Sequence, residues 1–378
     1  MTVPPPLKIL IVGAGSVGQI FGYHLSKGGA DVHFLVRDYQ APLLRSIPMR
    51  VHRLCAPGEK RIPTKTALLS IPEKNIYTID DVEAGQLPLD FNCILIAVSS
   101  AALRGRWIRD LLQVIHSNPK CILYCFSPGV SDCHYIIQSC GIVASRIVRS
   151  QANFISWPAP LEGQAFNPIP SKERLVGVQG SHSHQPITAY FVNGPQLFSR
   201  SDSVATEKIT ARLLACLRTT NLASEQTQVL PSLFRLRQSV LVPLLIGLSI
   251  ADWKFRKLFN DRKLLRITIE ASREGLDRVC TLHDMTDFRW TTFWMFFLFW
   301  GLIVQLAILL VLPVVQPMDA QAFLKFHFTK YESQTMLHAE EEIDEGAAAG
   351  HPANKLIELV QLHPRWNSRM SLVRYKSQ

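Results

Sequence analysis

The chain has 378 residues, of which 47% are hydrophobic and 19% charged, and its formal net charge is +10. These values indicate a globular protein that leans apolar, with two domains as the expectation from its length. The lysines and arginines are spread along the chain without a recognition motif, which excludes nucleic acid as the expected partner and leaves an anionic cofactor or a membrane surface.

The first apolar run ends in a glycine-rich turn. Ile9 to Val12 predicts a buried strand, residues 13–18 read G-A-G-S-V-G, and an apolar helical pattern follows. A second apolar run, Val32 to Val36, comes after the helix. This order is typical of a dinucleotide site, because the glycines allow a tight turn and let a pyrophosphate approach the helix N-terminus. The alternative is a glycine-rich turn without a ligand.

The end of the second strand bears on the choice of dinucleotide. An Asp or Glu there would accept a hydrogen bond from the ribose 2′-OH of NAD. This chain has Arg37, whose guanidinium matches a 2′-phosphate as a bidentate donor, so the sequence favours NADP(H). In the alternative, Arg37 is a solvated loop residue and Asp38 binds the ribose.

Strands and helices continue to alternate as far as Val148. A hairpin is expected over Met49 to Ile76, and the apolar runs Asn92 to Val98 and Cys121 to Phe126 predict central parallel strands on either side of a helix from Ala101 to His116. This alternation predicts a doubly wound α/β sheet, in which ligands lie outside the carboxyl ends of the strands. We therefore expect one cleft bordered by residues 13–18, 98–100 and 127–129.

Strands and loops rich in Pro, Gly, Ser and His are expected between about residues 150 and 200. His182 and His184 lie there in a loop without a neighbouring carboxylate, which indicates a solvated turn. The eight cysteines form no C-x-x-C pair and no signal peptide precedes them, so we expect reduced thiols, no metal site and a cytoplasmic protein.

From Val204 onward the apolar spacing is helical. Helices are predicted over Thr206 to Leu217, Leu230 to Ile250 and Arg262 to Val279. Glu270 and Glu274 lie one turn apart on the third of these helices. They suit either an acid–base pair or a solvated, ion-paired helix face, and the second is the expectation.

Residues 290–318 contain no charged side chain, and this run is longer than the roughly 20 residues that cross a bilayer as a helix. Four interpretations stay open: a transmembrane span, a hairpin lying in the membrane interface, a membrane-docking helix and a buried, very apolar helix pair. Two amphipathic helices are predicted after it, Ala320 to Glu345 and Ala353 to Leu362.

Four stretches of the sequence together resemble the ketopantoate reductase family in a divergent form. They are the glycine-rich turn quoted above, N-C-I-L-I-A-V-S-S (residues 92–100), C-F-S-P-G-V (125–130) and the tail motif G-H-P-A-N-K-L-I-E-L (350–359). The resemblance implies a Rossmann domain over residues 1–200 with bridging strands, and a helical domain over 201–378. It also implies NADPH and the reduction of a 2-keto acid or related carbonyl.

The chain departs from the family at the positions that carry catalysis. Ser99 stands where the family has a Lys, and Pro128 stands where it has an Asn. For the catalytic Lys of the family this chain offers Phe234 or Arg235, and no ammonium replaces it. The catalytic residues are therefore left unassigned.

The helix predicted over Leu230 to Ile250 also carries Gln238 and Val242 at the positions of two Asn residues of the family. Glu342 matches a Glu of the family only loosely by position.

An NADPH-dependent reductase and a catalytically silent NADP(H)-binding protein both stay open, as do a homodimer and a membrane contact through residues 290–318. The candidate cofactor-binding residues are Gly13, Ala14, Gly15, Ser16, Val17, Gly18, Arg37, Val98, Ser99, Pro128 and Gly129.

Overall fold

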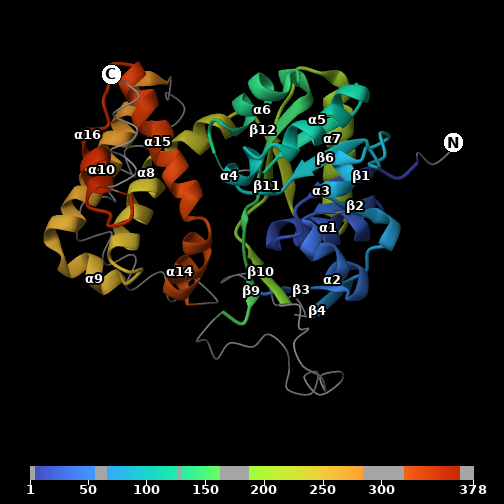
Figure 1. The fold of residues 1–378 in the computed structure, drawn as a ribbon, viewed down its shortest axis with the longest axis horizontal. Coiled ribbons are helices and arrows are strands. Elements are labelled where there is room, and N and C mark those ends of the chain that lie inside the picture. The colour runs from blue at the N-terminus through green and yellow to red at the C-terminus, as the bar shows by residue number, and fades with distance from the viewer. Residues whose placement is uncertain (1–4, 56–65, 127–128, 162–186, 284–318, 367–378) are drawn as a thin grey trace. The chain divides into compact units, whose positions relative to one another are not determined.

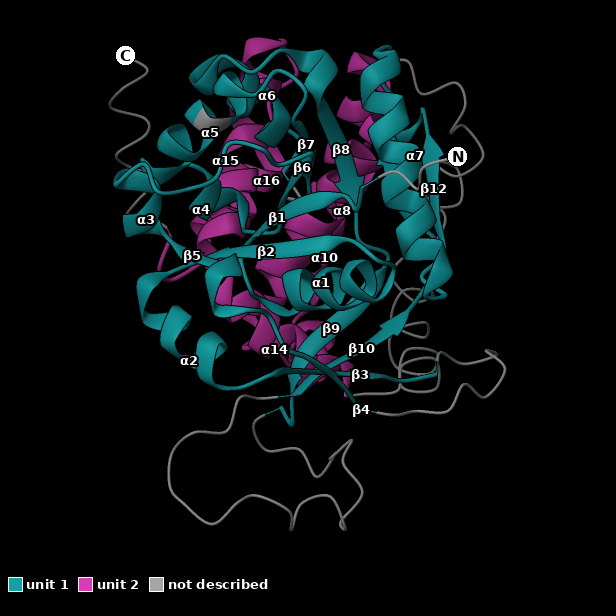
Figure 2. Ribbon diagram, turned by 90° about the vertical axis from the view of Figure 1, so that its right-hand side faces the viewer, with its two compact units in different colours: residues 1–230 teal, residues 231–378 magenta. Residues whose placement is uncertain are grey.

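The computed structural model describes residues 5–55, 66–126, 129–161, 187–283 and 319–366 (Figure 1). It divides into two compact units, residues 1–230 and 231–378 (Figure 2). The division lies later than the expected boundary after residue 200, because α7 (Val204–Thr219) and β12 (Ser224–Thr227) pack with the first unit. The expectations for Pro128, His182, His184 and residues 290–318 fall outside the described residues.

An eight-stranded sheet forms the centre of the first unit, in the spatial order β12-β11-β8-β7-β6-β1-β2-β5. All neighbouring strands run parallel except β8 and β11, which are antiparallel. The predicted doubly wound sheet is thus confirmed. The bounds of its other strands are β1 (Lys8–Val12), β2 (Asp31–Val36), β5 (Ile76–Thr78), β6 (Cys93–Ile96), β7 (Ile122–Cys125), β8 (Ile147–Gln151) and β11 (Gln196–Ser199).

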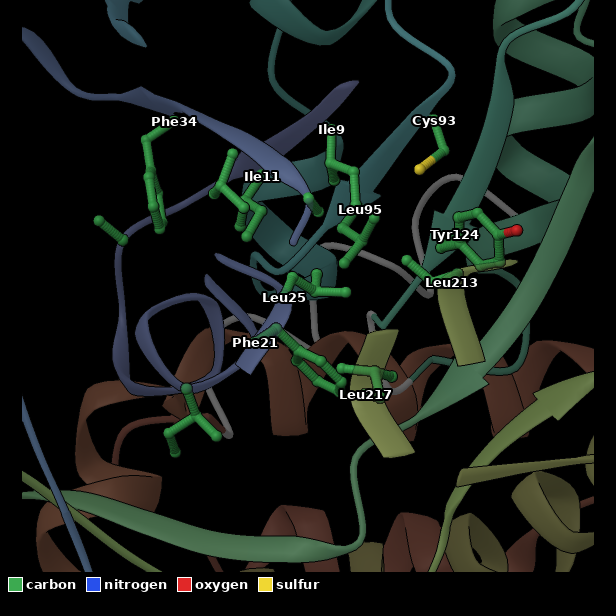
Figure 3. Close-up of a cluster of buried hydrophobic side chains, with 14 of the residues drawn as sticks. Ile9, Ile11, Phe21, Leu25, Phe34, Cys93, Leu95, Tyr124, Leu213 and Leu217 are labelled. Atoms are coloured by element: carbon green, nitrogen blue, oxygen red, sulfur yellow. The ribbon is translucent and has the colours of Figure 1, made fainter. Parts of the chain in front are cut away.

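Apolar side chains cover both faces of this sheet, as a central parallel sheet requires. On β1, Ile9 and Ile11 face a cluster with α1 (Ser16–Lys27) and α7, whereas Leu10 and Val12 face a second cluster. Figure 3 shows the first cluster, in which Phe21 and Leu217 come from the two helices. The other helices of this unit are α2 (Ala41–Ser46), α3 (Ile79–Glu83), α4 (Ser100–Leu103), α5 (Trp107–Ser117) and α6 (Asp132–Cys140).

The helix expected from Ala101 to His116 is two helices, α4 and α5. The break lies at Gly105, a poor helix former, where the Trp107 indole nitrogen comes within 2.5 Å of the place a Cβ would occupy. The indole therefore folds back over the chain at a point where a glycine leaves room for it. The sequence pattern alone did not reveal this break, because the apolar spacing continues across it.

A second, four-stranded sheet has the order β4-β3-β10-β9. The strands β3 (Met49–Arg53) and β4 (Thr66–Leu69) are antiparallel, as the expected hairpin predicts. The strand β10 (Ile187–Val192) runs parallel to β3 and antiparallel to β9 (Phe154–Ala159). The predicted bridging strands between residues 150 and 200 therefore supply strands to both sheets of the unit.

The second unit is helical over its described residues. Its core is a buried apolar cluster to which α8, α10 and α16 contribute, for example through Ile246, Ile267 and Leu356. The predicted helix from Ala320 to Glu345 is interrupted at Tyr331. The helices are α8 (Leu230–Ile250), α9 (Phe255–Asn260), α10 (Arg262–Leu282), α14 (Ala320–Lys330), α15 (Glu332–Ala348) and α16 (Asn354–Gln361).

One helix in the described part of the chain, α8, is long and apolar enough to cross a membrane. Most of its apolar stretch is buried, and Val242, Leu245 and Leu248 pack in the core of the helical unit. A core helix of a folded domain has the same length and composition, so α8 gives little support to a membrane association.

Candidate cofactor-binding site and a polar cluster in the helical unit

The glycine turn lies against the end of the neighbouring strand. Gly13 has a φ of +99°, and its N–H donates to the Leu35 carbonyl of β2 at 2.9 Å. A Cβ at Gly13 would lie 2.9 Å from the Ala97 carbonyl oxygen and 3.0 Å from Val98 Cγ1, just beyond β6. Glycine is therefore required both by the backbone conformation and by the close approach of the two strand ends.

Gly18 and Gly15 serve different purposes. A Cβ at Gly18 would come within 1.9 Å of the Gly13 carbonyl oxygen, so Gly18 lets α1 pack on the turn. A Cβ at Gly15 would meet nothing within 4 Å, and Gly15 is exposed at the N-cap of α1, in extended backbone with a φ of −69°. The fold of this unit therefore does not require a glycine at residue 15, and the space beside it is open.

The amides that begin α1 receive no side-chain cap from the residues the structure describes. The first helical residues, Ser16 and Val17, follow Gly15 directly, so free N–H groups and the positive end of the helix dipole lie at the turn. Gln19 supports the turn, since its Nε2 donates to the Ala14 carbonyl at 2.9 Å. Such a helix end binds anions.

Arg37 directly follows β2 and is exposed. Its Nη1 lies 3.4 Å from the hydroxyl of Tyr39, which is 70% exposed. The adjacent Asp38 begins a short 3₁₀ helix, and its Oδ1 accepts a weak hydrogen bond of 3.4 Å from the Asp80 N–H. Arg37 and Tyr39 thus lie together in solvent at the end of β2, and the Asp38 carboxylate contacts the start of α3.

The ends of β6 and β7 bring the other candidate residues to the same edge of the sheet. Ser99 caps α4, because its Oγ accepts from the Ala102 N–H at 3.2 Å. The Gly129 N–H donates to Asp132 Oδ2 at 2.8 Å. The carboxyl ends of β1, β6 and β7 are neighbours, so the structure places Gly13, Val98 and Gly129 along one edge.

Asp132 is a residue of this edge that the sequence interpretation missed. Its side chain is fully buried, and it accepts from Ser100 Oγ at 2.7 Å as well as from Gly129. Arg104 also forms an ion pair with it. The signal available in the sequence was a carboxylate three residues after Gly129 at the start of a helix, which is a common solvent-exposed arrangement.

In the helical unit, the positions that the sequence matched to the catalytic Lys and the two Asn residues of the family carry other side chains. Phe234 and Val242 are buried and apolar. Arg235 forms a 2.6 Å ion pair with Glu345, which also lies 3.5 Å from His283 Nε2. No ammonium stands at these positions, so any polarising cation here would be a guanidinium.

Glu342 lies in a buried polar cluster of α8, α10 and α15. Its Oε2 accepts from Arg278 Nη2 at 3.2 Å, and it also interacts with Gln238. Both members of the ion pair are more than nine-tenths buried, with 5% and 8% of their side chains exposed. Burial raises the pKa of Glu342 to about 7, although the Arg278 charge and the Gln238 hydrogen bond oppose the rise. A carboxyl group with this pKa both holds and releases protons near neutral pH.

Glu270 and Glu274 take part in structural contacts. Glu274 Oε2 accepts from the Lys355 N–H at 2.7 Å and from the Leu356 N–H at 3.4 Å, so it caps α16 from α10. Glu270 forms ion pairs with Arg266 at 3.3 Å and with Lys355 at 3.2 Å. These contacts fit the ion-paired helix face that the sequence favoured. No cluster of metal-ligating side chains occurs among the residues for which coordinates are described.

Comparison with known proteins gives one family match, to ketopantoate reductase PanE/ApbA over residues 9–124. No curated protein sequence matches the chain. A PanE/ApbA family ketopantoate reductase from Ralstonia eutropha JMP134 is 11% identical, with 97% of this chain and 100% of that one covered and a TM-score of 0.60.

Two further solved structures share the fold. A D-mandelate dehydrogenase in a ternary structure with NADH and anilino(oxo)acetate is 12% identical, with 97% and 99% of the two chains covered and a TM-score of 0.59. A dimeric ketopantoate reductase from Staphylococcus aureus is 7% identical, with 96% and 99% covered and a TM-score of 0.54. The resemblance inferred from the sequence is thus confirmed: residues 9–124 match the ketopantoate reductase family, and the fold is the one that ketopantoate reductases adopt.

Proposed function

We propose that this protein is an NADPH-dependent oxidoreductase that reduces a 2-keto acid or a related carbonyl compound. The observation that carries the proposal is the open space at Gly15, beside a helix N-terminus that no described side chain caps. A glycine that the fold itself does not need, placed where free amides gather, fits the close approach of a pyrophosphate. The family match over residues 9–124 supports the same interpretation.

The proposed cofactor site extends from that turn along the carboxyl edge of the sheet. The amides of Ala14, Ser16 and Val17 would hold the pyrophosphate, and Gly13 and Gly18 would keep the turn tight. Across the edge, the backbone beyond β6 and β7 would border the rest of the nucleotide. The described residues there are Val98, Ser99 and Gly129, and Pro128 is included in the proposal from the sequence alone.

Arg37 carries the proposed preference for NADPH over NADH. It is exposed at the end of β2, where a guanidinium can bind a 2′-phosphate through two parallel hydrogen bonds. Tyr39, whose hydroxyl lies 3.4 Å from Arg37 Nη1, offers a further donor at the same corner. The mandelate dehydrogenase of similar fold was solved with NADH, so both nucleotides need to be tested.

A bound NADPH would supply the hydride for a carbonyl carbon, and the protein would have to supply a proton to the oxygen. The catalytic residues stay unassigned. Within the helical unit, Phe234 and Val242 are apolar and buried, and this specific observation favours a second candidate function, a catalytically silent NADP(H)-binding protein.

One experiment separates the two functions. Purified protein is titrated with NADPH and with NADH by cofactor fluorescence, and a panel of 2-keto acids is then added while absorbance of the reduced nicotinamide is followed. The reductase predicts tight NADPH binding and oxidation with at least one keto acid. Binding without turnover over a broad panel would establish the silent binder, and no binding at millimolar nucleotide would contradict both.

A homodimer is our proposal for the assembly. The solved ketopantoate reductase from Staphylococcus aureus is described as dimeric and covers 96% of this chain. Sedimentation velocity at micromolar protein would show a single species of twice the 42.6 kDa chain mass if the proposal holds, and a monomer would contradict it.

A further inference from the structure

One buried carboxylate joins the two loops that follow β6 and β7. Asp132 Oδ2 accepts from Ser100 Oγ at 2.7 Å, on the β6 side, and from the Gly129 N–H at 2.8 Å, on the β7 side. The absence of a side chain at Gly129 leaves room for this contact, because a Cβ there would lie 2.7 Å from the same oxygen. Ser100 and Gly129 are thereby linked through a side chain that is fully buried.

Arg104 compensates the buried charge and adds its own contacts to both loops. It pairs with Asp132 Oδ1, while its Nη1 also donates to the Ser100 carbonyl at 2.9 Å and its Nη2 to Ser131 Oγ at 2.8 Å. A buried carboxylate is costly unless it is paired and hydrogen-bonded, and this one is both. The arrangement therefore favours one fixed geometry of the two loops.

Arg149 of β8 also binds the segment that contains Gly129. Its Nη1 donates to the Gly129 carbonyl at 3.0 Å, and its Nη2 donates to the Val130 carbonyl at 2.6 Å. Backbone donors and acceptors of the Gly129 segment are thus bound by two charged side chains from different elements. Charge-assisted hydrogen bonds of this kind are stronger than neutral ones.

The position of these loops in the sheet decides which part of a dinucleotide they border. The strand order is β7-β6-β1-β2, with the glycine turn after β1 and Arg37 after β2. A nucleotide with its pyrophosphate at the turn and its 2′-phosphate at Arg37 has its adenosine half on the β2 side. The other half, which ends in the nicotinamide, then extends toward β6 and β7.

We propose that Asp132 is a positioning residue for the nicotinamide half of the cofactor, acting by holding Ser100 and Gly129 in one geometry. The inference rests on the proposed function, since it needs a dinucleotide at this edge. It assigns different halves of one ligand to different residues: Arg37 binds the adenosine half, and Asp132 fixes the backbone that borders the other.

The test is an Asp132→Asn variant titrated with two ligands, NADPH and adenosine 2′,5′-bisphosphate, which contains only the adenosine half. Asn keeps the volume but offers a single acceptor oxygen and no charge for Arg104. We expect NADPH to bind about tenfold more weakly, as for a damaged buried charged hydrogen bond. The affinity for the bisphosphate should change by less than about twofold.

A Tyr124→Phe variant is the matched control. It also removes a buried hydrogen bond in the β7 region, the 2.8 Å contact with Thr210 Oγ1, and it leaves the two loops untouched. This variant should bind both ligands as the wild type does. If Asp132→Asn does not fold, Ser100→Ala, which removes one donor only, should give the same ligand-selective loss at a smaller size.

Three results would overturn the inference. Equal weakening of both ligands would indicate a general structural role for Asp132, and unchanged binding of both would remove any role in positioning. A wild-type protein that binds the bisphosphate but not NADPH would show that no nicotinamide site exists. Failure of the wild type to bind either ligand is different, because it would contradict the proposed function itself.

Discussion

The glycine turn of the first unit and the Arg278–Glu342 pair of the second unit differ in whether their charged groups are exposed or buried and paired. At the turn, positive groups are left available: free amides begin α1, and Arg37 stands in solvent. In the helical unit, opposite charges are buried against each other at 3.2 Å. An available charge suits a ligand, whereas a buried pair mainly fixes how helices pack.

The comparison separates binding from stability. Changes at Gly15 and Arg37, which face open space or solvent, should lower nucleotide affinity without lowering stability. Changes at the buried pair should lower the free energy of unfolding. The predictions that follow test this separation, in order of decreasing free-energy change.

Replacing Arg278 with Met should give the largest effect, a loss of about 3 to 4 kcal/mol in unfolding free energy at pH 8. The buried Glu342 would lose its ion-pair partner, and its carboxyl group would have to stay an uncompensated charge or take up a proton at that pH. Urea denaturation followed by circular dichroism measures it. The double variant Arg278→Met with Glu342→Leu should recover most of the loss. A single variant as stable as the wild type would show that the pair is energetically unimportant.

Stability should also depend on pH through Glu342. Its pKa is about 7 in the folded protein against an ordinary value of 4.5, so between these values the folded state holds a proton that the unfolded chain releases. Stability is therefore favoured at low pH and falls as the pH rises through this window, by about 3 kcal/mol. Denaturation of wild type and Glu342→Gln at several pH values isolates this contribution, which the variant should lack. Parallel pH profiles would contradict it.

Replacing Gly18 with Ala should cost about 2 kcal/mol, because the new Cβ cannot fit against a backbone oxygen that does not move freely. The oxygen is that of Gly13, only 1.9 Å from the ideal Cβ position. NADPH affinity should fall as well, since the turn itself is displaced. Gly194→Ala, where nothing lies within 4 Å of the added carbon, is the control for the substitution.

Replacing Arg37 with Leu should have the smallest effect on free energy and the most selective one. NADPH should bind roughly tenfold more weakly, the value of one lost charge-assisted contact in solvent, and NADH affinity should stay unchanged. Isothermal titration with the two nucleotides measures the ratio. Equal loss for both would mean that Arg37 does not recognise the 2′-phosphate.

The parts of this protein that the sequence predicted are those that local pattern determines. The strand Lys8–Val12, the turn and the helix Ser16–Lys27 are read directly, because apolar runs and obligatory glycines mark them. The edge formed by Gly13 and Val98 followed from the rule for parallel sheets. The helices of the second unit were predicted by spacing in the same way.

What escaped prediction depends on contacts between distant residues. Ser100 meets Asp132 across 32 positions, and Arg278 meets Glu342 across 64, so nothing local distinguishes these side chains from solvated ones. The break at Gly105 depends on where one indole ring folds. The domain boundary also lay later than expected, because the helical pattern of α7 carries no sign that it packs on the sheet.

The most direct test of the proposed cofactor site is NADPH binding by Gly15→Ala, compared with Gly194→Ala. Both glycines have open space around the added carbon, so neither variant should lose stability. The proposal predicts that only Gly15→Ala loses NADPH affinity, by about tenfold or more, because its methyl group would enter the space of the pyrophosphate. Unchanged NADPH affinity in Gly15→Ala would contradict a nucleotide at this turn.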